Sequence, residues 1–229
     1  CSSGSVRRHV AGCCSCARMD WATRPRHRGH RRLHRGGVPA EVPAVQHAEG
    51  IRDRALGRLR RQGISDENKA HLNIPAELRT LSSEQEKLIL KDSISPLPLH
   101  KALVLRDEIN RFEHTTFSGH LRLAFANALV YKISNLRFGP EVGIGKAKDD
   151  VAVVANWFEE VQKICYDVEN VSEKEFPVAD VFLSDSRDPT SLLKHRQVSA
   201  VITSPPYPNE KDYTRTTRLE SVMLGFISD

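Results

Sequence analysis

The sequence predicts an α/β protein with a parallel βαβ unit near its C-terminal end, a helical region before that unit, and an irregular N-terminal part. Two short apolar runs, Val178–Leu183 and Val198–Thr203, flank a helix start at Asp188-Pro189. Apolar residues recur at helical spacing between about residues 83 and 165, whereas the arginine-rich stretch 24–37 has no apolar period. Strand–helix–strand with short connections is typical of parallel pairing.

Charge is distributed unevenly along the chain. Residues 1–68 contain fourteen Arg, no Lys and six acidic residues, a balance of +8. Residues 69–229 contain eleven Lys, nine Arg and twenty-three acidic residues, a balance of −3, which gives the net +5 of the whole chain. The basic character therefore belongs to the first part, and the rest of the protein is mildly acidic.

Three interpretations of residues 1–68 are open. The first is an arginine-rich arm that binds nucleic acid. The second is a metal knuckle at Cys13, Cys14 and Cys16, although structural zinc ligands are usually spaced two to four residues apart. The third is a segment translated out of frame from GC-rich DNA, which would explain arginine without lysine. We expect this part to be disordered or out of frame.

Residues 69–170 are predicted to form a helical region. Ser83-Glu84-Gln85-Glu86 has the form of a capping box, and the prolines of Ser95–Pro98 end the helix that it starts. Three apolar stripes at helical spacing follow, and each is expected to pack in the core: Ala102, Leu105, Ile109 and Phe112; Leu121, Phe125 and Leu129; Val151, Val154, Phe158, Val161 and Cys165.

Residues 171–229 are predicted to contain the βαβ unit. Ligands of parallel sheets bind beyond the carboxyl ends of the strands. The two predicted strands end at Ser184-Asp185-Ser186 and at Ser204-Pro205-Pro206-Tyr207. Because the chain starts at Cys1 and stops at Asp229 inside a helical pattern, we expect it to be a fragment.

The residue types of the second strand end suit methyl transfer to an aromatic amine. The lone pair of such a nitrogen is delocalised, so a site must accept hydrogen bonds from the NH2 group. The Ser204 hydroxyl can accept one, and the Pro205 carbonyl can accept another on a backbone that Pro205 and Pro206 hold rigid. Tyr207 can stack on a base that has left its duplex. The alternatives are a simple turn or a proline-rich ligand of a small binding domain.

Thr203–Tyr207 resembles the catalytic motif of the amino-directed DNA methyltransferases, (Ser/Asn/Asp)-Pro-Pro-(Tyr/Phe). Ser184-Asp185-Ser186 resembles the acidic strand end that precedes this motif in many members, and the resemblance covers roughly residues 95–229, including the segments 134–143 and 208–220. It implies a Rossmann-like fold with a helical insertion, S-adenosyl-L-methionine as cofactor, and Ser204, Pro205, Pro206 and Tyr207 as catalytic residues. Cytosine N4 is the preferred acceptor, adenine N6 is possible, and Asp185 would help to bind the cofactor.

The resemblance also implies partners. Double-stranded DNA is the expected substrate, and Lys211, Tyr213, Arg215 and Arg218 would contact it beside the flipped base; the alternative is a solvated, charged helix. A cognate restriction endonuclease and a prokaryotic cytoplasmic location are expected, and no apolar window approaches the roughly 18 residues of a membrane span.

The family's glycine-containing cofactor loop is not readable in this frame, so we expect weak or absent cofactor binding. The alternatives to a DNA methyltransferase are an RNA or protein amino-group methyltransferase, and a non-catalytic or degraded fragment.

Overall fold

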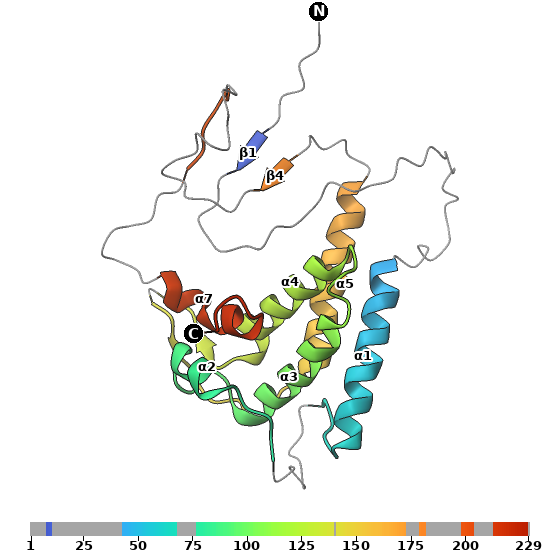
Figure 1. Cartoon of the computed structure of the whole chain (residues 1–229), viewed down its shortest axis with the longest axis vertical. Helices are drawn as coiled ribbons and strands as arrows, with labels where there is room; N and C mark the ends of the chain where they lie inside the picture. The colour runs from blue at the N-terminus through green and yellow to red at the C-terminus, as the bar shows by residue number, and fades with distance from the viewer. Residues whose placement is uncertain are drawn as a thin grey trace, which may run out of the picture. The chain divides into compact units, whose positions relative to one another are not determined.

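A computed structural model describes the chain at residues 8–10, 43–67, 77–139, 141–172, 179–181, 198–203 and 213–228 (Figure 1). The chain divides into two compact units. The first comprises Cys1–Gly37 and Ser172–Pro208, and the second comprises Val38–Val171 and Asn209–Asp229.

Most of the regular structure is helical and belongs to the second unit. Its elements are α1 (Pro43–Arg61), α2 (Ser83–Leu88), α3 (Pro96–Asn110), α4 (Ser118–Ala128), the π-helical turn η1 (Leu129–Ile133), β2 (Leu136–Arg137), β3 (Gly143–Ile144), α5 (Val153–Ser172) and α7 (Tyr213–Met223). β2 and β3 pair antiparallel, with Leu136 opposite Ile144. In the first unit, β1 (Arg8–Val10) and β4 (Ala179–Val181) pair parallel, with Arg8 opposite Ala179.

Helix α1 forms because a stripe of mostly small apolar residues recurs on one face and is buried: Ala44, Ala48, Ile51, Ala55 and Leu59. The helix ends in a Schellman motif. Gly63 adopts a φ of 73°, the N–H of Ile64 donates to the Leu59 carbonyl at 3.0 Å, and that of Gly63 donates to the Arg60 carbonyl at 3.0 Å. Because α1 has a defined C-terminal cap and a buried apolar face, it is an integral part of the second unit.

The core of the second unit lies among α1, α3, α4, α5 and α7, and Figure 1 shows α1 running alongside α3. The three apolar stripes predicted from the sequence are confirmed. Their members are buried or packed against this core, with Phe112, Phe158 and Cys165 only partly covered. At 0% exposure, Trp157 of α5 packs in the centre and its indole N–H donates to the Leu121 carbonyl at 3.1 Å.

The capping box of helix α2 begins at Ser82, one residue earlier than predicted. Ser82, not Ser83, is the N-cap: its hydroxyl accepts the Gln85 N–H at 3.2 Å, and the Gln85 side chain accepts the Ser82 N–H at 3.3 Å. α2 is a single short helix that ends at Leu88, before the prolines, and Pro96 occupies the first turn of α3.

Two buried polar groups hold the loops around this core. Asn135, 3% exposed, donates its side-chain N–H groups to the Asp92 carbonyl and the Ser95 hydroxyl at 3.0 and 3.1 Å, and accepts the Lys148 N–H at 2.9 Å. Lys101 of α3 reaches Asp150 at 2.6 Å. These contacts fix the segments that precede α3 and α5.

The predicted α/β class, with its parallel βαβ unit in a Rossmann-like sheet, is wrong. Strand β4 does form within the predicted run Val178–Leu183, but its described partner is β1 and not residues 198–203. Residues 198–203 form no strand, and Val201 and Ile202 are 78% and 97% exposed. A short apolar run forms a strand only where the backbone of a neighbouring strand pairs with its N–H and C=O groups. The local sequence pattern does not show whether such a partner is present. The predicted helix start at Asp188 lies outside the described residues.

The expectation of an irregular N-terminal part is wrong for residues 43–61, which form α1. The arginine density of residues 1–68 suggests one uniform segment, but α1 buries a face that includes Ala44, Ala48 and Ala55 and keeps its arginines off that face. Alanine contributes little hydrophobic area, which is why the stripe is weak in the sequence, although it is the best helix former. The metal knuckle at residues 13–16 lies outside the described residues.

Candidate functional site

Most of the site residues predicted from the sequence lie outside the described residues. These are the four motif residues, the acidic residue of the first strand end, and one basic residue: Ser204, Pro205, Pro206, Tyr207, Asp185 and Lys211. The structure therefore leaves their mutual geometry undescribed. The remaining three, Tyr213, Arg215 and Arg218, belong to α7.

Helix α7 is anchored by its apolar residues and carries the two predicted arginines near its start. Leu219, Val222 and Met223 are buried in the core of the second unit. Arg215 is exposed and Arg218 is half-buried, three residues apart, so they share one side of the helix. Tyr213 is the first residue of α7. The placement of both arginines at a helix surface fits a contact with phosphates and fits a solvated charged helix equally well.

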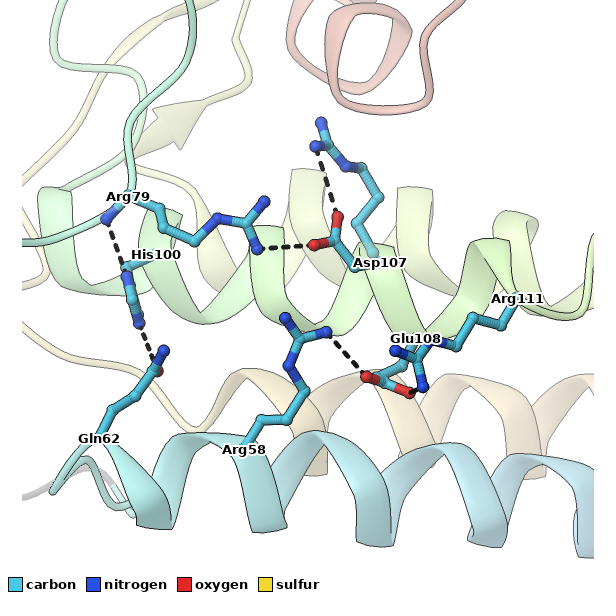
Figure 2. Close-up of polar contacts among 8 residues, drawn as sticks. Arg58, Gln62, Arg79, His100, Asp107, Glu108 and Arg111 are labelled. Carbon is cyan, nitrogen blue, oxygen red and sulfur yellow. Dashed lines mark hydrogen bonds and ion pairs between the residues drawn. The ribbon is translucent and has the colours of Figure 1, made fainter.

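A cluster of arginines and carboxylates between α1 and α3 was not predicted from the sequence (Figure 2). Its centre is Glu108 of α3, whose side chain is 0% exposed. Arg58 of α1 donates to Glu108 Oε1 at 2.8 Å, and Arg54 Nε and Arg111 Nη1 lie 3.3 and 3.4 Å from Oε2. A single buried carboxylate therefore holds three guanidinium groups from two helices.

The same residues line a surface depression of about 580 Å³. Its lining consists of Arg54, Arg58, Arg61 and Arg111 together with Asp53, Gly57 and Glu108. Four guanidinium groups and two carboxylates give the lining a formal charge of +2. The side chains of Arg54, Arg58 and Arg111 remain 41%, 31% and 62% exposed, so water and solutes reach them.

A second ion cluster is centred on Asp107 of α3, the residue before Glu108. Asp107 accepts from Arg79 Nη1 at 2.7 Å, and Arg106 Nη2 lies 3.7 Å from the other carboxylate oxygen. Figure 2 shows Arg79 reaching α3 from a separate segment of the chain. Because Asp107 is one-third exposed, water screens this cluster more strongly than the one at Glu108.

His100 of α3 joins three segments and has a fixed tautomer. The Arg79 backbone N–H donates to His100 Nδ1 at 2.9 Å, so Nε2 carries the proton and donates to Gln62 Oε1 at 2.9 Å. Burial lowers the pKa of His100, and the nearby charges of Arg79 and Lys101 lower it further. With both ring nitrogens engaged and the side chain buried, His100 serves to hold the end of α1 and not to transfer protons.

The lowered pKa of His100 predicts a loss of stability on acidification. Below about pH 6.5, the ordinary histidine pKa, the unfolded chain binds a proton that the folded protein does not bind until lower pH. The contribution of this histidine to folding is complete above that value and is lost as the pH falls toward the folded-state pKa. We expect His100→Gln to flatten the decrease in the unfolding free energy between pH 7.5 and 5, measured by urea denaturation. An equally steep decrease in the variant would contradict the assignment.

The chemistry available at the Glu108 cluster is recognition of anions. Guanidinium groups stay charged at all accessible pH values and donate to oxyanions in a planar, often bidentate geometry. Within the described ranges, no group of three or more His, Cys, Asp or Glu side chains could hold a metal ion. None of the described helices is both long and apolar enough to cross a membrane.

The sequence does contain a signal for this cluster. Arg54, Arg58 and Arg61 stand at positions i, i+4 and i+7, which places them on one side of a helix. The high arginine density of residues 1–68 masks this signal, because the apolar face of α1 consists mostly of alanines. The contribution of Glu108 and Arg111 from α3 requires knowledge of which helices pack together.

The chain matches no protein-family model, no curated protein and no solved structure.

Proposed function

We propose that the chain carries the base-binding part of a DNA amino-methyltransferase that transfers a methyl group from S-adenosyl-L-methionine to cytosine N4, or to adenine N6. The observation that carries the proposal is the sequence Ser204-Pro205-Pro206-Tyr207, preceded by Ser184-Asp185-Ser186. It does not depend on a Rossmann-like sheet, and we do not propose one.

In this proposal each motif residue has its own task. The Ser204 hydroxyl and the Pro205 carbonyl accept the two hydrogen bonds of the target amino group, and Tyr207 stacks on the flipped base. Accepting both hydrogens draws the nitrogen toward tetrahedral geometry and frees its lone pair for attack. After methyl transfer, the nitrogen is positively charged and loses one proton.

Among the described residues we assign no site to the methyl donor, S-adenosyl-L-methionine. In α/β enzymes such a cofactor binds beyond the carboxyl ends of parallel strands. One depression is lined by Glu159, Gln162, Lys163, Tyr166 and Asp167 of α5, and neither it nor the depression between α1 and α3 is lined by a residue of a strand. We assign the motif residues to the acceptor base. Because the glycine-containing cofactor loop is not readable in this frame, we expect S-adenosyl-L-methionine to bind this chain weakly.

The test is methyl transfer to duplex DNA from labelled S-adenosyl-L-methionine. Losing one positioned hydrogen-bonding group at a reacting centre costs about 100-fold or more in turnover, so Ser204→Ala should reduce transfer by at least that factor. Ser199→Ala, the same substitution at an exposed serine five residues earlier, is the matched control and should leave transfer unchanged. Full turnover by Ser204→Ala would refute the assignment.

A second candidate is a non-catalytic fragment of such an enzyme. The exposure of Val201 and Ile202, directly before the motif, favours it, because a catalytic strand end in an α/β enzyme needs a buried strand to position it. Titration calorimetry with S-adenosyl-L-methionine separates the two candidates. Binding, even if weak, together with methyl transfer would favour the enzyme, and absence of both binding and transfer in the unaltered chain would favour the fragment.

A further inference from the structure

The depression between α1 and α3 carries more positive charge than its internal ion pairs require. Glu108 has three guanidinium partners, Arg54, Arg58 and Arg111. The shortest of these contacts, from Arg58 at 2.8 Å, is already a charge-assisted hydrogen bond between α1 and α3. One such bond is enough to join the helices, so the other two arginines exceed what a structural link needs.

Arg61 strengthens this conclusion because it has no ion pair with any of the described residues, although it lines the same depression. Its guanidinium lies over Gly57, one turn earlier, where an added Cβ would be 3.7 Å from Arg61 Nη1. No carboxylate among the described residues explains a cation at this position.

The guanidinium groups are held in place before any ligand arrives. Glu108 is fully buried on α3, accepts a hydrogen bond from Arg58, and forms longer ion pairs with Arg54 and Arg111. Arg54 also lies 4.9 Å from the centre of the Phe112 ring. A charged side chain that is already ordered loses less conformational freedom on binding than a free one. This arrangement is typical of a built anion site and unlike a set of independently solvated arginines.

We propose that this arginine depression, lined by Arg54, Arg58, Arg61 and Arg111, binds the phosphodiester backbone of nucleic acid. The proposal is independent of methyl transfer and of the motif at residues 204–207, and it shares with the proposed function only the class of partner. It assigns a contact to α1, a part of the chain for which the sequence predicted no structure.

The shape of the cluster favours a backbone over a single anion. Arg54 and Arg61 are seven residues apart on α1, which corresponds to about 10 Å along a helix. A row of cations of that length fits successive phosphates better than one small oxyanion. The described lining of the depression contains no aromatic side chain that could stack on a base, so the contact should be independent of base sequence.

The experiment compares Arg61→Gln with Arg60→Gln. Both arginines are exposed neighbours on α1, and both changes remove one positive charge, but only Arg61 lines the depression. Binding of a fluorescein-labelled duplex DNA of random sequence is measured by anisotropy between 50 and 200 mM salt. Log K falls linearly as log salt concentration rises, and each lost phosphate contact makes this dependence less steep by about 0.9. We expect that reduction, with weaker binding, for Arg61→Gln and not for Arg60→Gln.

The design isolates the depression from the rest of the chain. Both variants keep the arginines of residues 1–37, so any binding from that part is common to both. Equal slopes for the two variants would overturn the proposal, as would a failure of the unaltered chain to bind the duplex. Complete displacement of the duplex by millimolar inorganic phosphate at constant ionic strength would show a site for a single anion and would also overturn it. Methyl transfer and duplex binding are measured in separate assays on the same protein, so failed methyl transfer and failed backbone binding are distinguishable.

Discussion

Replacing Lys101 by Met should reduce the unfolding free energy by about 3–5 kcal/mol, the range measured when one partner of a buried ion pair is removed. Lys101 is 0% exposed and its ammonium lies 2.6 Å from Asp150 Oδ1, with a second contact of 3.2 Å to the Val151 carbonyl. Asp150, 8% exposed, would keep its charge in the protein interior without the Lys101 ammonium. Methionine fills similar volume, so the loss reports the missing charge and not a cavity. Urea denaturation measures it.

A double variant tests this explanation. Lys101→Met with Asp150→Asn removes both charges and retains an amide oxygen that can accept the Val151 N–H, which Asp150 accepts at 2.7 Å in the unaltered protein. Replacing both members of a buried pair is much less costly than breaking it. The double variant should therefore be more stable than Lys101→Met alone. A double variant less stable than the single one would show that the cost comes from packing.

The helical core was predictable because each of its stripes is set by local sequence. Ala102, Leu105 and Ile109, and likewise Leu121 and Phe125, follow the helical period with large apolar side chains, and burial follows from that period. The capping box was found with an error of one residue, since Ser82 and Ser83 offer two overlapping patterns and only the backbone geometry selects Ser82. Local signals of this kind predict an element more reliably than its first residue.

The lack of a strand at residues 198–203 was not predictable from the sequence, because a strand is defined by its partners. The run has the composition of a buried strand, yet Ile202 is almost fully exposed. The real pairing, β1 with β4, joins residues about 170 positions apart, and no local pattern indicates it. The same limit applies to the arginine depression. The row Arg54, Arg58, Arg61 can be read from the sequence, but its meeting with Glu108 depends on α1 packing against α3.

The candidate catalytic residues show the opposite case. Ser204 to Tyr207 are candidates because of the hydrogen-bonding and stacking groups that they carry. These groups follow from the residue types and their order, without knowledge of the fold. Their arrangement in space depends on contacts distant in the chain. The motif therefore specifies a hypothesis about function that the experiment on Ser204 tests directly, whatever the surrounding architecture.

Replacing Trp157 by Ala should reduce the unfolding free energy by about 3–5 kcal/mol, the usual cost of truncating a large aromatic side chain in a core. Trp157 is the largest fully buried side chain of the described residues. It contacts the Phe158 ring at 6.4 Å between centroids, and its N–H donates to the Leu121 carbonyl at 3.1 Å, which joins α5 to α4. Thermal and urea unfolding, followed by circular dichroism, measure the effect.

Trp157→Phe separates the two contributions to this effect. Phenylalanine keeps most of the apolar area but loses the donor, so the Leu121 carbonyl loses this hydrogen bond. A net hydrogen bond contributes about 0.5–1.5 kcal/mol. Trp157→Phe should therefore lie between the unaltered protein and Trp157→Ala. Stability equal to that of the unaltered protein would show that the 3.1 Å contact contributes nothing. Stability equal to that of Trp157→Ala would show that the hydrogen bond, and not packing, joins α4 to α5.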